Sequence, residues 1–494
     1  MTTDVRSPVS ADDRQHDNPN HDRRWLVLCI VALAQLMVVL DSTIVSIALP
    51  QAQQGLGIGD ADRHWAVTAY ALAFGALLLL GGRIADFWGR KRSFLVGAAG
   101  FAVASALGGI AQNGSQLFAA RAGQGVFAAL LAPAALAILT TTFVAKKERA
   151  TAFAVYGAIS GGGAAVGLLL GGLLTEYLDW RWCLLVNVPI AAFAFAAAAP
   201  IVAETRAHGD TAYDLPGTVL VALGLGALVY GCTEAEKFGW ASAQALGFIA
   251  GGLAALAAFV FVERRATNPL LPLYIPWNTN RAPALLGSVA MGAVLIGGTL
   301  YLTFYLQIVL GMSPFVSGAA ALPLTVAITL AAGIATQLSV RVGPKLPMAV
   351  GPLVAAVGLL LLTRIEVDSS YATRVLPALI VLGLGLGLLI APMQNMALVG
   401  VRDQDAGAAS ALVNATMQVG GALGTALFTT IYVAAKSGYA GSHPGAHPFA
   451  TEVSGYIDVF TWAAVLLALI SPIVVLLVRA DKDSLPAEGA VGLH

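Results

Sequence analysis

The chain has 494 residues, of which 58% are hydrophobic and only 11% are charged, and its mean hydropathy is +0.79. A soluble domain is typically about half apolar and about a quarter charged, so this composition excludes an ordinary globular protein and predicts a chain surrounded mostly by lipid. The 27 Lys and Arg residues balance the 27 Asp and Glu residues, which gives no reason to expect a nucleic-acid partner.

Apolar stretches long enough to cross a bilayer, about 20 residues each, recur along the chain. Residues 1–24 precede them and lack the basic patch and brief apolar core of a secretory signal, so we expect a disordered cytoplasmic tail there and another at 480–494. Between the tails the sequence predicts fourteen spans: 25–49, 65–82, 93–111, 116–143, 151–174, 183–202, 215–231, 243–262, 282–310, 317–340, 346–362, 375–399, 406–435 and 456–478.

The basic residues indicate how these spans are oriented. With the amino terminus inside, 20 of the 27 Lys and Arg residues fall in cytoplasmic segments and six fall in outer segments. This distribution satisfies the positive-inside rule, so we expect a multi-pass protein with both termini in the cytoplasm.

The first span contains an acid, Asp41. It lies 16 residues beyond Trp25, roughly 24 Å from the cytoplasmic end of a helix that rises 1.5 Å per residue. Arg121 lies five residues into the fourth span, roughly 8 Å from the outer end. In a bilayer core of about 30 Å both residues fall in the outer half, where they can interact.

An intramembrane pair of this kind has two interpretations. A neighbouring cation favours the charged carboxylate and burial favours the protonated acid, so Asp41 can serve as a proton-coupling carboxylate that Arg121 tunes. The alternative is a static ion pair that only fixes the first and fourth spans. A folded Asp41→Asn variant distinguishes them, because only the first interpretation requires proton-driven transport to be lost.

The loop after the second span combines glycines with opposite charges. Gly82 and Gly89 permit a tight turn, and Asp86 can pair with basic residues such as Arg90 or Lys91 or face a helix amino terminus. We expect a gating loop that latches two parts of the protein together. The alternative is a basic loop that only sets orientation.

Short matches relate the two ends of the chain. Residues 131–133 (LAP) lie 259 positions before 390–392 (IAP), and the same offset relates the paired glycines at 161–162 and 420–421. The matches predict two related six-span bundles, at 25–202 and 282–479, with 203–281 supplying a linker and two inserted spans. Two such bundles with a site between them are the architecture of rocking transporters.

Several motifs resemble those of one family. Residues 40–50 (LDSTIVSIALP) look like the first-helix motif of the fourteen-helix drug:proton antiporters of the major facilitator superfamily. The loop at 82–92 (GRIADFWGRKR) resembles the superfamily's loop signature, and 121–125 (RAGQG) matches its membrane-embedded arginine motif. The resemblance covers nearly the whole chain. It implies a major facilitator fold and proton-coupled efflux of lipophilic drugs or antibiotics across a bacterial cytoplasmic membrane.

The fifth span is similar to the antiporter helix of that family. Its glycines Gly161, Gly167, Gly171 and Gly172 match the motif and permit close helix contact. Leu168 departs from the pattern, because the family often has proline there. The kink attributed to that proline is therefore not expected from the sequence.

Neutral polar residues in the spans are candidates for a substrate cavity. Each either lines such a cavity or bonds between helices, and for any one residue packing is the simpler interpretation. Spans nine to thirteen offer no deep acid to pair with a second positive charge, so we expect a neutral, monocationic or weakly acidic lipophilic substrate. The candidates are Gln35, Gln307, Gln337, Asn395, Asn414 and Gln418.

Other functional classes are disfavoured by what the chain lacks. It has no G-x-x-x-x-G-K-[ST] phosphate loop, so energy must come from a gradient; we expect no cofactor other than the proton gradient, and no metal. The seven histidines lie outside the spans, which argues against a membrane-embedded enzyme. A proton-linked uptake symporter stays open as an alternative. We expect a functional monomer in the lipid bilayer.

Overall fold

The protein is described by a computed structural model for residues 20–206, 214–266, 269–402 and 405–479. Most of the predicted tail at 1–24 and all of the tail at 480–494 therefore lie outside the described residues. Residues 20–24 are ordered. Asn20 is buried, accepts a hydrogen bond from the backbone N–H of Ala203 at 2.8 Å, and donates one to the Thr142 hydroxyl at 3.3 Å.

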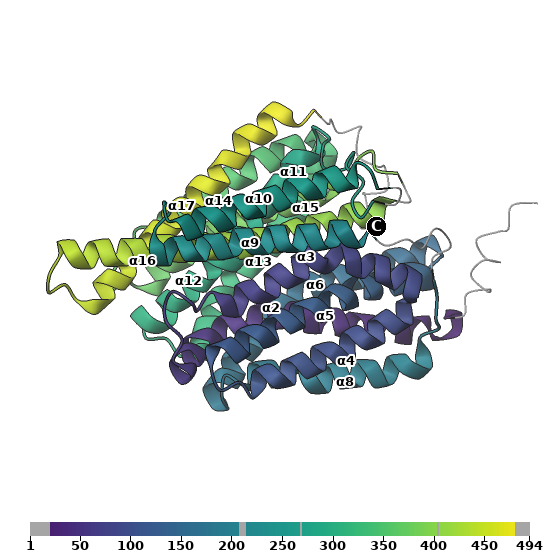
Figure 1. Ribbon diagram of the computed structural model, residues 1–494, viewed down its shortest axis with the longest axis horizontal. Helices are drawn as coiled ribbons and strands as arrows, with labels where there is room; N and C mark the ends of the chain where they lie inside the picture. The colour runs from purple at the N-terminus through teal and green to yellow at the C-terminus, as the bar shows by residue number, and fades with distance from the viewer. Residues whose placement is uncertain (1–19, 207–213, 267–268, 403–404, 480–494) are drawn as a thin grey trace, which may run out of the picture.

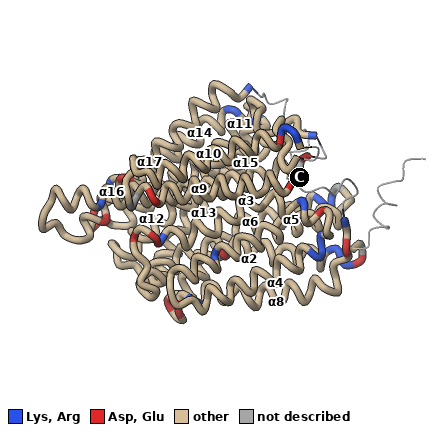
Figure 2. Tube along the Cα trace, viewed as in Figure 1, with Lys and Arg blue, Asp and Glu red and all other residues tan. Residues whose placement is uncertain are grey.

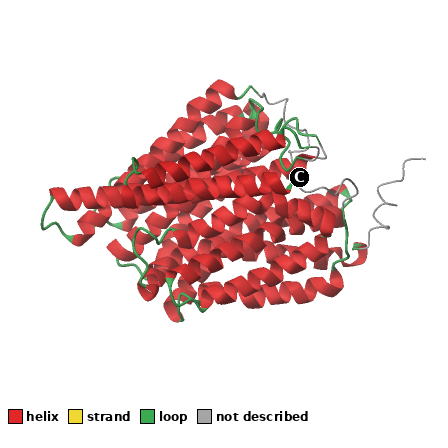
Figure 3. Cartoon of the chain, viewed as in Figure 1, coloured by secondary structure: helices red, strands yellow, loops and turns green. Residues whose placement is uncertain are grey.

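Throughout the described residues the secondary structure is helical (Figure 3), and fourteen helices are long and apolar enough to cross a membrane. The first half contains η1 (His21–Arg23), α2 (Arg24–Leu56), α3 (Trp65–Trp88), α4 (Arg90–Gly109), α5 (Gly114–Thr142), α6 (Lys146–Tyr177), α7 (Trp182–Leu185) and α8 (Asn187–Ile201). Next come α9 (Leu215–Phe238) and α10 (Ala243–Glu263). The second half contains α11 (Arg281–Gly292), η2 (Ala293–Gly298), α12 (Thr299–Phe304), η3 (Tyr305–Val309), α13 (Pro314–Val342), α14 (Lys345–Leu362), η4 (Tyr371–Val375), α15 (Leu376–Leu398), α16 (Ala406–Ser442) and α17 (Pro448–Leu477).

The number of spans agrees with the sequence prediction, but several boundaries and interiors differ. The sixth span is broken into α7 and α8, and the ninth contains the π-helical segments η2 and η3. Helix α9 continues past its predicted end at 231. Helix α16 runs past its predicted end at 435 and α17 begins before its predicted start at 456, so the two helices extend as a hairpin. Hydropathy marks where a helix enters lipid, whereas backbone hydrogen bonding continues into the polar flanks.

Local sequence signals fix where helices begin. The Asn113 side chain accepts a hydrogen bond from the backbone N–H of Gln116 and caps α5, and Ser313 caps α13 in the same way through Val316. Pro314 follows as the first residue of α13, a position where its missing N–H costs nothing. Helix α2 ends at Leu56, and Gly57 follows it with a φ of 63°, a left-handed conformation that favours glycine.

The helices form two bundles with α9 and α10 between them (Figure 1). The amino-terminal half is α2–α8 and the carboxyl-terminal half is α11–α17. Helices α9 and α10 lie side by side, and α9 also packs on α3 and α16. The halves meet mainly through the pairs α3 with α16 and α6 with α13.

Charged residues gather at the two ends of the bundle (Figure 2). We call the end that holds the start of α2 and the α3–α4 loop the termini end, and the end that holds the α2–α3 loop and the α16–α17 hairpin the far end. The long walls between the two ends are apolar, as a lipid-facing surface requires.

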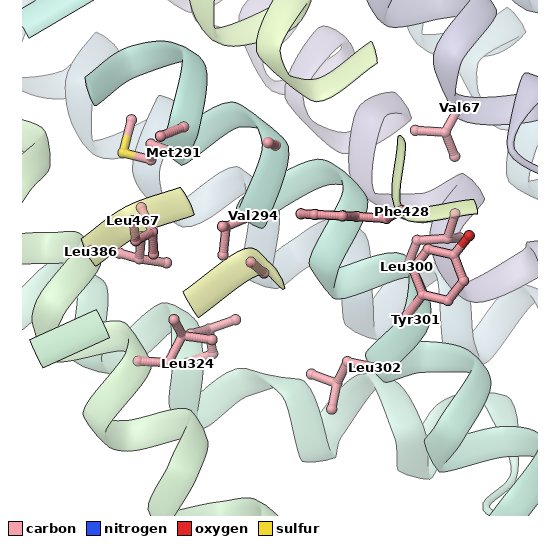
Figure 4. Packing of buried hydrophobic residues seen from close by; sticks show 14 of the residues in the cluster. Val67, Met291, Val294, Leu300, Tyr301, Leu302, Leu324, Leu386, Phe428 and Leu467 are labelled. Carbon is pink, nitrogen blue, oxygen red and sulfur yellow. The ribbon is translucent and has the colours of Figure 1, made fainter. Parts of the chain in front are cut away.

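The halves are in close contact at the far end. The amide of Gln307 donates to the carbonyl of Ile47 at 3.0 Å, and the backbone N–H of Phe315 donates to the Glu176 carboxylate at 3.0 Å. A Cβ added at Gly318 would lie 2.4 Å from the Leu168 carbonyl oxygen. One hydrophobic cluster spans this contact, and Figure 4 shows its members from both halves, among them Val67 of α3 and Leu300 of α12.

At the termini end the same two helices, α6 and α13, are open. A Cβ added at Gly157, Gly161 or Gly162 of α6, or at Gly333 of α13, would meet no atom of the described residues within 4 Å. Ile334 of α13 is 56% exposed. The halves are therefore closed at the far end and separated along α6 and α13 at the termini end.

Candidate functional site

The predicted pair of Asp41 and Arg121 forms a direct, buried ion pair. The Arg121 Nη1 lies 2.6 Å from the Asp41 Oδ2, and the side chains of Arg121 and Asp41 are 1% and 0% exposed. The pair joins the middle of α2 to the first turns of α5, which begins at the far end. The depth expected from helix rise therefore agrees with the contact.

Two amides complete the shell around the Asp41 carboxylate. Its Oδ1 accepts hydrogen bonds from the Gln124 amide at 2.9 Å and from the Asn187 amide at 2.7 Å. Gln124 is one turn after Arg121 on α5, and Asn187 is the first residue of α8, at the break in the sixth span. Gln124 also donates to the Ser105 hydroxyl of α4 at 2.7 Å. One carboxylate thus holds α2, α5 and α8 together.

Arg121 is held from a second side by α3. Its Nε donates to the Ala66 carbonyl at 2.8 Å, and its guanidinium lies 4.5 Å from the centre of the Tyr70 ring. This approach depends on Gly125, where an added Cβ would lie 2.5 Å from the Tyr70 carbonyl oxygen. Gly125 of the 121–125 motif therefore brings α5 close enough to α3 for Arg121 to bond to the α3 backbone.

Gln124, Asn187 and Ser105 are members of this site that the sequence reading missed. Gln124 lies inside the 121–125 motif, but neutral amides are common in the spans and carry no signal of their own. The spacing of Gln124 from Arg121 was the available signal, because residues three apart lie on one helix face.

The loop between α3 and α4 makes some of the contacts that were predicted for a gating loop. Arg90 pairs with Asp86 at 3.0 Å, as expected. Gly89 has φ 126°, and the Glu204 carboxylate after α8 accepts the backbone N–H groups of Lys91 and Arg92. Arg83 donates to the Pro269 carbonyl, after α10, at 2.8 Å. The loop therefore bonds to its own half and to the segment after α10. A Cβ added at Gly82 would lie at an ordinary contact distance from the Pro133 Cβ.

The four glycines of α6 are in different surroundings. A Cβ added at Gly167 would lie 2.0 Å from the Thr43 hydroxyl, and one added at Gly171 would lie 2.8 Å from the Ile44 side chain. These two glycines therefore allow α6 to pack closely against α2. Gly172 instead faces the other half, where an added Cβ would lie 2.6 Å from the Phe315 Cα. The close contact predicted for this motif is absent at Gly161, as described above.

The six neutral polar candidates do not share one site. Gln35 donates to the Ser160 hydroxyl and accepts from Tyr156, both on α6, while Gln307 bonds across the halves at the far end. Gln418 is buried against Gly75 of α3. The side chains of Asn414 and Gln337 are exposed, and Asn395 is half-buried.

Two bundles of apolar helices with an ion pair buried between the first and fourth spans define a polytopic membrane transporter. The chain belongs to the Major Facilitator Superfamily, whose family model matches residues 31–425. It is 45% identical to the puromycin resistance protein of Streptomyces alboniger over 98% of this chain and 97% of that protein. It is 37% identical to the cephamycin export protein of Amycolatopsis lactamdurans, covering 92% and 93% of the two chains.

A solved structure confirms the fold. The structure superposes on that of a bacterial homologue of the human lysosomal transporter Spinster with a TM-score of 0.66, covering 94% of this chain and 98% of that one, at 15% identity. Among the described residues, no group of His, Cys, Asp and Glu side chains has the arrangement of a metal site.

Proposed function

We propose that the protein is a proton-coupled antiporter that exports lipophilic small molecules from a bacterial cell by alternating access. The observation that carries this proposal is the buried Asp41 carboxylate and its direct bond to Arg121. The names of the relatives, which refer to resistance or export of antibiotics, favour export over uptake.

Protonation of Asp41 would change the bonding between three helices. While the carboxylate is charged, Arg121 is neutralised and Oδ1 holds two amides. A proton removes that counter-charge and leaves Arg121 with neutral acceptors, among them the Gln124 and Ala66 carbonyl oxygens. Because an unpaired buried charge is costly, the two protonation states favour different packings of α2 against α5 and α8. This two-state element can couple proton movement to the opening of one end or the other.

The orientation belongs to the same proposal. Basic residues of the α3–α4 loop, the start of α6 and the linker after α10 lie at the termini end, which we assign to the cytoplasm. The far end then faces outside. With α6 and α13 apart at the termini end, the described conformation is open to the cytoplasm, where an exporter would collect its substrate. Exposed Gln337 lies near the end of α13 and exposed Asn414 near the start of α16, both toward the termini end.

The substrate is proposed to be lipophilic and neutral, monocationic or weakly acidic. Asp41 is already neutralised by Arg121, so it has no spare charge for a dication. Susceptibility profiling in an efflux-deficient host should begin with the compounds named for the relatives, puromycin and cephamycin. Increased resistance identifies a substrate. Stronger protection against divalent than monovalent organic cations would refute the charge assignment.

Inverted membrane vesicles test antiport. With respiration maintaining a proton gradient, addition of an identified substrate should dissipate part of the gradient in vesicles containing the protein and not in vesicles containing Asp41→Asn. Substrate-induced dissipation that persists in a well-folded Asp41→Asn variant would contradict the coupling role. Substrate entry that carries protons into the vesicles with it, and so makes the medium more alkaline, would favour the uptake alternative.

A further inference from the structure

The far end carries a second buried cation that the proposed mechanism does not use. Arg63 lies in the α2–α3 loop, and its side chain is 1% exposed. Its guanidinium carbon is 3.9 Å from the ring centre of Phe304, 4.6 Å from that of Tyr432 and 5.5 Å from that of Tyr301. All three rings belong to the carboxyl-terminal half. A loop of one half thus inserts a cation into an aromatic cage of the other.

Few polar bonds hold this guanidinium. Its Nη1 lies 3.5 Å from the Asp60 carboxylate of the same loop. Within the described residues its Nε and Nη2 have no hydrogen-bond partner. Burial of an unbonded cation is costly, and attraction to the ring faces offsets that cost only while the cage surrounds it. Arg63 is therefore stable in the cage only when the halves touch at this end.

A second contact bridges the halves beside the cage. Lys436 of α16 lies 2.8 Å from the Asp60 carboxylate and 2.5 Å from the Glu452 carboxylate of α17. The hydroxyl groups of Tyr432 and Tyr456 donate to Glu452, which fixes that carboxylate in its own half. Lys436 therefore reaches from an anchored position across to the other half.

The charges balance on each side of this contact. If the halves separated here, Asp60 and Arg63 would stay together on one half, and Lys436 and Glu452 would stay together on the other. Separation would expose the charges to water without leaving any of them unpaired. A contact with this property can close and reopen, unlike the Asp41 pair, whose separation strands a charge.

We propose that Asp60, Arg63, Lys436, Glu452 and the aromatic cage form a reversible outer gate that holds the far end shut while the termini end is open. This inference rests on the alternating access of the proposed function and adds the residues that hold its outer closure. Withdrawal of Arg63 from the cage is the event that opens the path outward.

Distance measurements between spin labels test the gate. Labels at Gln54→Cys and His443→Cys report the separation of the halves, because both positions are exposed at the far end, one in each half. The native Cys29, Cys183 and Cys232 are replaced by serine in this background. Removing the cation with Arg63→Ala should raise the ratio of open to closed far ends by about tenfold or more, and Arg63→Lys should raise it less.

Two further variants make the result decisive. Phe304→Leu removes the nearest ring from the opposite half and should shift the distances in the same direction. Arg181→Ala is the matched control, since Arg181 also lies over an aromatic ring at the far end, 4.5 Å from Trp180, but within one half. It should leave the distances unchanged. A third variant, Arg63→Ala/Asp60→Asn, also weakens the bridge from Asp60 to Lys436. Identical distance distributions for wild type, Arg63→Ala and this double variant would overturn the gate, whatever the vesicle assay shows about antiport.

Discussion

At the scale of single residues, the Asp41 site depends on neutral amides as much as on charge. Asn187 donates to a fully buried carboxylate, and a hydrogen bond to a charged group contributes about 1.5–3 kcal/mol to stability. We expect Asn187→Ala to lower the free energy of unfolding by about that amount. Thermal unfolding of the purified protein measures the change.

Asn414 supplies the control for that prediction. Its side chain is exposed and donates to the Ser410 carbonyl of its own helix. Asn414→Ala should change stability by about 0.5 kcal/mol or less, as most surface substitutions do. Equal losses of unfolding free energy for the two variants would mean that the hydrogen bond from Asn187 to Asp41 does not stabilise the protein.

Asp60 gives the outer gate a defined response to acid. Burial alone would raise the pKa of the Asp60 carboxyl, but hydrogen bonds from Lys436 and Gln53 and the charge of Arg63 outweigh it and lower that pKa below its ordinary value of 3.8. A lowered pKa means that the carboxylate stabilises the fold above 3.8 and that this contribution is lost as the pH falls through the lower value.

The difference in melting temperature between wild type and Asp60→Asn isolates this contribution. It should stay constant from pH 7 to pH 5 and shrink only below about 3.8. Glu452 contacts the same lysine but is present in both proteins, so its titration does not enter the difference. A difference that disappears between pH 6 and pH 5 would show that the Asp60 pair is not stabilised as described.

At the scale of elements, the glycines of α6 have unequal roles in the described conformation, in which α6 and α13 are in contact at the far end. An added Cβ at Gly172 would lie 2.7 Å from the Pro314 carbonyl oxygen, whereas at Gly161 it would meet no described atom within 4 Å. We expect Gly172→Ala to destabilise the protein by about 1–3 kcal/mol through overpacking. Gly161→Ala should be neutral or stabilising by up to about 1 kcal/mol, because alanine favours the helix. Thermal unfolding compares them, and a larger loss for Gly161→Ala would contradict the described closure.

The helices themselves were largely predictable, and the breaks within them were not. Hydropathy predicts a span from its average, so it located all fourteen helices. It is insensitive to the break before Asn187 and to the π-helical turns at 293–298 and 305–309, because a local change of hydrogen-bond register leaves the composition of a span unaltered. Such turns often mark functional positions, and here they flank α12, which supplies two rings of the cage.

At the scale of the whole molecule, buried charge could be predicted where it breaks the pattern of its own span. Asp41 and Arg121 are anomalous in apolar helices, and helix rise brings them to one depth. Arg63 is in a short polar loop, where an arginine is expected to be solvated. Its burial results from α12 and α16, which are remote in sequence, so no local pattern indicated the cage.

The proposed orientation also belongs to the whole molecule. A fluorescent protein fused to the carboxyl terminus should fold and fluoresce, because that terminus is assigned to the cytoplasm. A cysteine at His443, on the far-end hairpin, should react with an impermeant maleimide added to intact cells. Labelling only after the cells are opened would reverse the assignment of the two ends.

Transport in proteoliposomes tests the coupling role of Asp41 most directly. Substrate accumulation driven by a pH gradient is compared with substrate exchange at equilibrium, for wild type, Asp41→Asn and the charge-neutral Asp41→Asn/Arg121→Gln. We predict that both variants keep exchange and lose gradient-driven accumulation, and that the double variant recovers stability because it strands no buried charge. Recovery of gradient-driven accumulation in the double variant would show that the pair is only a structural tie between α2 and α5.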